Sequence, residues 1–99
     1  MSKTVYKYIL DGNMSPDPAG DFIRGTVQMP EGAIVRSAAM QAGGLVVWAE
    51  VDRRNVGSTV AHEFIVVPTG GEVPYIELEF VGTVFNGPFV WHIYWFNPS

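Results

Sequence analysis

The chain contains no cysteine, which excludes disulfide bonds, thiolate nucleophiles, iron–sulfur clusters and zinc sites built from cysteine. Charge is also scarce, because Asp, Glu, Lys and Arg supply only 16% of the 99 residues. A typical globular domain has about 25%. A small domain with so few charges has difficulty covering its own surface. Either that surface is polar and uncharged, or another subunit covers part of an apolar surface.

Basic residues number only six and the net charge is −4, so nucleic acid is not expected as a partner. No apolar run approaches the roughly 18 residues of a membrane-spanning helix. The N-terminal residues Met1–Thr4 lack the apolar core of a signal peptide. A small secreted domain usually depends on disulfides, so their absence favours a reducing compartment and a cytosolic location, without a membrane partner.

Apolar residues make up 47% of the sequence and aromatic residues 13%, enough for the core of one small domain over residues 1–99. β-branched and aromatic residues recur in short segments separated by turn-forming residues. About seven short antiparallel strands, with a turn roughly every 10 residues, predict an all-β sandwich or barrel with meander connections. The predicted strands are Thr4–Leu10, Phe22–Met29, Ala33–Gln41, Leu45–Asp52, Thr59–Val67, Tyr75–Phe85 and Phe89–Phe96.

The segment Ala33–Gln41 is ambiguous, because its alanines favour a helix. It is short and lies between two turns, so a strand is the preferred prediction. Two prolines, two glycines and three aspartates predict a flexible loop over Asp11–Asp21. Met29–Gly32 is typical of a hairpin turn, and Asn86–Gly87 is typical of a type I′ hairpin. Gly82 indicates a bulge.

The last predicted strand, Phe89–Phe96, is apolar and aromatic on both faces. A strand with one solvated face would alternate polar and apolar residues. This strand is therefore predicted to be buried on both sides, through a central position in the sheet, a covering loop or dimerisation. Together with the scarcity of charge, this pattern predicts a homo-oligomer, most simply a two-fold dimer.

No catalytic, metal or cofactor site is predicted. His62 and His92 are 30 positions apart and have no cysteine to complete a zinc site. Ser58 is not surrounded by the strand–turn–helix that presents a nucleophilic serine. Glu77 and Glu79 are expected on one strand face, which is the pattern of an ordinary solvated strand rather than a catalytic carboxylate pair.

Two groups of residues are candidates for contact with a partner. Arg53 and Arg54 form the only adjacent basic pair and lie in a polar loop, where they suit a small anionic ligand or an acidic protein surface. The ordinary alternative is a pair of solvated charges. Trp91, Tyr94 and Phe96 are candidates for an aromatic contact surface, although aromatic residues also dominate small β cores.

Four segments together carry a resemblance to a known family: Pro30–Ala33, Leu45–Asp52, Phe80–Thr83 and Phe89–Ile93. They are similar to segments of small uncharacterised proteins encoded by bacteriophages and prophages, which open with a strand like Tyr6–Tyr8 and end in a Val-Trp-His strand. The segment Asp11–Asp21 is longer here than in that pattern. The resemblance implies phage origin, a host-cytoplasmic location and a β-rich fold, but no activity and no functional residue.

Two functions are therefore considered, and an enzyme is not expected. The first is a structural or protein-interaction module that self-associates, binds a host protein, or does both. The alternative is a small-ligand binder, for example a phage anti-defence protein that sequesters a nucleotide signal between its subunits. The sequence leaves open whether the protein is a virion component or acts early in host takeover.

Overall fold

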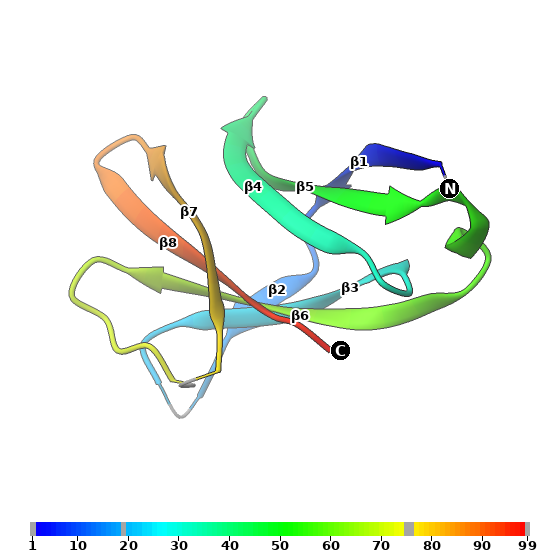
Figure 1. Cartoon of the computed structure of the whole chain (residues 1–99). Coiled ribbons are helices and arrows are strands. Elements are labelled where there is room, and N and C mark those ends of the chain that lie inside the picture. The colour runs from blue at the N-terminus through cyan, green and yellow to red at the C-terminus, as the bar shows by residue number, and fades with distance from the viewer. Residues whose placement is uncertain (1, 19, 75–76, 99) are drawn as a thin grey trace.

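The computed structural model describes residues 2–18, 20–74 and 77–98, and these form eight strands and one short 3₁₀ helix (Figure 1). The prediction of an all-β fold is confirmed, with one more strand than expected. The elements are β1 (Lys3–Ile9), β2 (Met14–Pro16), β3 (Ile23–Pro30), β4 (Ile34–Gln41), β5 (Gly44–Asp52), η1 (Arg53–Asn55), β6 (Thr59–Pro68), β7 (Glu79–Asn86) and β8 (Phe89–Phe96).

The strands form two antiparallel sheets (Figure 1). One has the order β1-β5-β4, and the other has the order β2-β3-β6-β8-β7. The predicted meander is wrong for four of the seven connections between these strands: β1–β2, β3–β4 and β5–β6 each cross from one sheet to the other, and β6–β7 skips over β8. The turn at Pro30–Ala33 forms as expected, with the Ala33 N–H donating to the Pro30 carbonyl at 3.1 Å. It is nevertheless a corner between two sheets and not a hairpin.

Two hairpin turns show where positive φ is needed. Ala42 (φ 53°) and Gly43 (φ 81°) join β4 to β5, which confirms the strand prediction for the alanine-rich segment. At the other hairpin Asn86 pairs with Phe89, so the central residues are Gly87 and Pro88. Only Gly87 has positive φ, at 59°. Those signs fit a type II′ turn, and the predicted type I′ turn centred one residue earlier is wrong.

Two predicted boundaries also change. Tyr75 and Ile76 lie outside the described residues, and β7 begins only at Glu79. Glu77 precedes the strand, so the prediction that it shares a strand face with Glu79 is wrong. β7 lies at the sheet edge beyond β8, so the connection from β6 has to pass β8, and Glu77 and Leu78 belong to this connection rather than to the strand. Within the predicted loop Asp11–Asp21, β2 pairs with β3.

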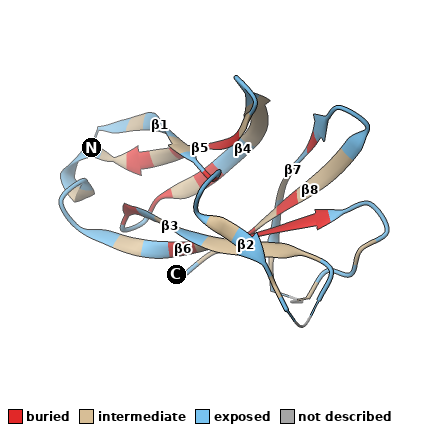
Figure 2. Ribbon diagram, turned by 180° about the vertical axis from the view of Figure 1, so that it is seen from behind, coloured by how far each residue is buried: buried red, intermediate tan, exposed pale blue. Residues whose placement is uncertain are grey.

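The hydrophobic core lies between the two sheets (Figure 2). Its buried members come from alternate positions of β5, β6 and β8, with contributions from their neighbours: Leu10, Met29, Ala33, Val35, Leu45, Val47, Ala49, Val51, Phe64, Val66, Val84, Ile93 and Trp95. On one side the sheets meet edge to edge. There a Cβ placed on Gly82 of β7 would lie 3.8 Å from the Ala38 nitrogen of β4. No helix in the described part of the chain is long and apolar enough to cross a membrane.

Candidate interaction surfaces

β8 presents two different faces. Ile93 and Trp95 point into the core and are buried, whereas the alternate residues lie on the outer face of the five-stranded sheet. Within the single chain the predicted burial on both faces is therefore wrong. β8 lies inside the sheet, between β6 and β7, but no other layer of the described chain covers its outer face fully, since Phe96 is 41% exposed.

The outer face of β7 and β8 is aromatic. Tyr94 lies opposite Phe80, and their rings meet edge to face with centroids 5.5 Å apart. Phe80 is 58% exposed and Phe85, opposite Val90, is 69% exposed. We call Phe80, Phe85, Val90, Tyr94 and Phe96 the outer aromatic face. Ordinary solvated strands do not carry such a run.

This face continues onto β6 and then meets polar residues. Ile65 and Val67 lie opposite Tyr94 and His92 on the same side of the sheet, and both are buried. Beyond them the Arg24 guanidinium of β3 forms ion pairs with Glu63 and Asp17. Because Ile65 and Val67 are already covered within the chain, the accessible apolar surface is confined to β7 and β8, with the Arg24 ion pairs at its border, an arrangement also found at protein–protein interfaces.

His92 forms a polar notch within the outer aromatic face. Its Nε2 lies 2.8 Å from the Thr69 hydroxyl and its Nδ1 lies 3.0 Å from the Thr83 hydroxyl. Both ring nitrogens are thus satisfied by hydroxyls that can donate or accept. His62 lies on the opposite, core-facing side of the sheet. Among the described residues no three potential ligands gather to hold a metal ion.

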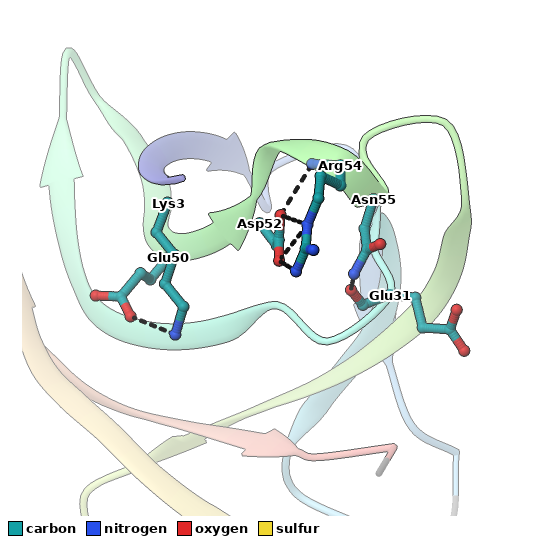
Figure 3. Close-up of polar contacts among 6 residues, drawn as sticks. All are labelled: Lys3, Glu31, Glu50, Asp52, Arg54 and Asn55. Carbon is teal, nitrogen blue, oxygen red and sulfur yellow. Dashed lines mark hydrogen bonds and ion pairs between the residues drawn. The ribbon is translucent and has the colours of Figure 1, made fainter. Parts of the chain in front are cut away.

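The predicted basic pair lies at the far end of the molecule, in η1 (Figure 3). The Asp52 carboxylate accepts hydrogen bonds from the Arg54 backbone N–H at 2.9 Å and from its guanidinium at 2.7 Å. The Arg54 side chain and backbone N–H hold the pKa of Asp52 well below its usual range, at about 2. Asn55 donates to the Glu31 carbonyl, which ties this turn to the β3–β4 corner. Asp52 therefore neutralises half of the positive charge expected to attract an anion.

Trp91 lies on the core side of β8, away from Tyr94 and Phe96, and lines two neighbouring cavities of about 240 and 290 Å³. Both cavities share Trp91 and Pro68 as walls. We call the two together the Trp91 groove. The first is also lined by Pro16, Gly20, Asp21, Phe22, Ile23 and Val66, and the second by Thr69, Pro88, Phe89 and Val90.

The structure thus separates the predicted contact residues into three places: Arg53 and Arg54 at η1, Tyr94 and Phe96 on the outer aromatic face, and Trp91 in its groove. Sequence analysis missed Phe80 and Phe85. In a regular strand two residues five positions apart point to opposite faces. A register shift between Phe80 and Gly82 puts both on the same face. The bulge predicted at Gly82 is the signal that would have found them.

No curated protein and no solved structure matches the chain. A family match covers residues 1–98, and therefore nearly all of the elements described above. The family carries no assigned activity in its description, in keeping with the resemblance to uncharacterised proteins. The chain belongs to the family described as Domain of unknown function (DUF7352).

Proposed function

We propose that this chain is a small protein-interaction module that self-associates through its outer aromatic face. The phage origin and host-cytoplasmic setting implied by the sequence resemblance are part of the proposal, and so is the binding of a host protein by the assembled module. The outer aromatic face is built from aromatic rings and hydroxyl groups and carries no charge at its centre. Such a surface suits protein–protein contact better than catalysis.

One observation carries the proposal: three phenylalanines remain exposed on one face of a sheet whose other face is the core. Phe80, Phe85 and Phe96 together leave roughly 300 Å² of aromatic surface in contact with water. That area lies at the lower end of the range for the largest apolar patch of a typical monomer, about 300–600 Å², and such a patch is often functional. At about 25 cal/mol per Å², covering this surface supplies a substantial driving force for association.

The second copy is the occupant that best fits this face. A two-fold dimer brings the same patch of each copy together, so an uncharged, apolar centre meets another uncharged, apolar centre. In such a dimer no like charges face each other across the interface. No unpaired charge is buried there either, and burying one would be costly. The ion pairs of Arg24 lie at the border of the face, where they stay accessible to water. The low overall charge of the chain is consistent with this arrangement.

The test is the oligomeric state of the full chain, measured by sedimentation equilibrium at micromolar concentration. A mass of at least twice 10.9 kDa is expected. Phe80→Ser and Phe85→Ser together should shift the equilibrium toward the monomer. Ile9→Ser is the matched control, because Ile9 is 57% exposed on the other sheet and should leave the mass unchanged. A parent chain that stays monomeric would refute the proposal, as would equal effects of the two sets of substitutions.

A further inference from the structure

The Trp91 groove has the shape of a site for an extended chain. Its two cavities share Trp91 and Pro68 as lining residues and otherwise have different walls, so a single occupant that fills both has to be long rather than compact. A compact small molecule would fill only one. The walls combine aromatic rings with three prolines, Pro16, Pro68 and Pro88. Such walls offer flat apolar contacts and few hydrogen-bonding groups.

The charge of the groove has one sign. Among the residues that the structure describes, Asp21 is the only charged one that lines either cavity, and its side chain is exposed. One carboxylate oxygen of Asp21 accepts the Glu72 backbone N–H over a long 3.5 Å, which brings the acidic Glu72 next to Asp21. No lysine or arginine of the described chain lines the groove. An anionic occupant would therefore meet only repulsion, whereas a cationic group would meet a carboxylate.

We propose that the Trp91 groove binds an extended, proline-containing and basic segment of a partner protein. Proline-rich segments form polyproline II helices, which have no internal hydrogen bonds and dock in aromatic-lined grooves at low entropic cost. Proline rings of the partner pack against Trp91 and Phe22, and an arginine or lysine of the partner pairs with Asp21. This inference concerns a surface that shares only Val90 with the outer aromatic face, and it does not depend on self-association.

The experiment uses the full chain and three fluorescein-labelled synthetic peptides. The first repeats Arg-Pro-Leu-Pro, the second repeats Glu-Pro-Leu-Pro, and the third repeats Arg-Ala-Leu-Ala. Fluorescence anisotropy at physiological salt should show saturable binding of the first peptide and at least tenfold weaker binding of the other two. The second peptide tests the need for positive charge, and the third tests the need for proline at the same charge.

Variants locate the binding in the groove. Asp21→Asn should weaken binding of the Arg-Pro peptide about two- to fivefold, as for an exposed ion pair. Its matched control is Glu31→Gln, which removes one carboxylate at the opposite end of the molecule and should change nothing. Trp91→Leu keeps an apolar side chain and should weaken binding tenfold or more, as truncation of an aromatic anchor does. A thermal melt of each variant confirms that the fold is retained.

Four outcomes would overturn the proposal. The first is no saturable binding of the Arg-Pro peptide, and the second is equal binding of all three peptides. The third is competition by benzylamine, a small aromatic cation, at the same concentration as the unlabelled peptide, which would assign the groove to a small molecule. Loss of binding in Phe80→Ser/Phe85→Ser, with Trp91→Leu unaffected, would also place the peptide elsewhere. These results are independent of the sedimentation test, so either proposal can fail alone.

Discussion

The indole N–H of Trp95 donates a hydrogen bond to Nδ1 of His62 at 3.0 Å, and the two rings stack with centroids 5.9 Å apart and planes inclined by 12°. Because Nδ1 accepts this bond, the neutral imidazole carries its hydrogen on Nε2. That nitrogen is buried and has no hydrogen-bond partner among the described residues. Burial lowers the pKa of His62. Protonation would place a hydrogen on Nδ1 and break the bond to Trp95.

This pair predicts a loss of stability in mild acid. The pKa of His62 in the unfolded chain is about 6.5 and is lower in the folded chain. The unfolded state therefore binds the proton first, and the contribution to stability is complete above about pH 6.5 and falls as the pH is lowered. The slope that one proton contributes can be no steeper than about 1.4 kcal/mol per pH unit. Urea unfolding between pH 8 and pH 5 measures it.

One histidine variant separates this effect from the titration of carboxylates. His62→Gln should lower stability at pH 8, because it disturbs a buried contact, but should flatten the pH dependence between pH 7 and pH 5. If the parent chain shows the same unfolding midpoint throughout this range, His62 does not titrate as described.

Gly25 is predicted to tolerate no side chain. It pairs with Met14 in the β2–β3 ladder, and a Cβ at this position would lie only 1.8 Å from the Asn13 carbonyl oxygen. Backbone cannot move aside as a flexible side chain does, so Gly25→Ala should destabilise by about 1–3 kcal/mol or more. Gly57→Ala is the control, because a Cβ there meets nothing within 4 Å. Equal denaturation midpoints for the two variants would contradict the close approach of β2.

Gly87→Val should destabilise the β7–β8 hairpin. The backbone at Gly87 has a φ of 59°, which costs a residue with a Cβ about 1–2 kcal/mol and a β-branched residue more. The space around Gly87 is open, so the cost comes from the backbone alone. Thermal unfolding compares this variant with Gly57→Val, whose backbone does not have positive φ. A parent-like melting temperature for Gly87→Val would mean that the turn adopts another conformation.

The Asp52–Arg54 contact gives a spectroscopic prediction. Replacing Arg54 by alanine removes the guanidinium but keeps the backbone N–H, so the pKa of Asp52 should rise from about 2 part of the way toward its usual range. An NMR titration of the side-chain carboxyl carbon measures the change. Arg53→Ala should leave this pKa unchanged. The same titration in the presence of inorganic phosphate would show whether the basic pair binds an anion, which remains a prediction.

Alternation and turn residues predicted most of the strands, because both are local properties of the chain. The strand Phe89–Phe96 was predicted with its observed boundaries. Turn chemistry alone does not say which strands a turn joins. Proline and glycine at Pro30 and Gly32 produce the same tight turn whether the next strand pairs with the last or crosses to the other sheet. The order of the strands depends on how the two sheets pack around their common hydrophobic core, and no local sequence pattern predicts this packing.

The candidate surfaces were predicted less well, for a geometric reason. Trp91 and Tyr94 are three positions apart on one strand, so the pleat sends them to opposite faces. The two aromatic side chains, although close in the sequence, therefore contribute to two different surfaces. The pairing of Asp52 with Arg54 was also not expected, because Arg54 had been considered only with its neighbour Arg53. Residues two positions apart come together here through the tight turn of η1.

The edges of the two sheets determine how far association can extend. The edges β4 and β7 face each other, with a cavity of about 250 Å³ between them, so each partly shields the other from another molecule. Of the remaining edges, β2 is only three residues long and ends in Pro16, and β1 carries Lys3 and Lys7. Short edges, proline and lysine each disfavour the addition of a foreign strand. A chain with little charge to keep its copies apart is thereby protected from growing into fibrils, even while one of its faces remains open to contact.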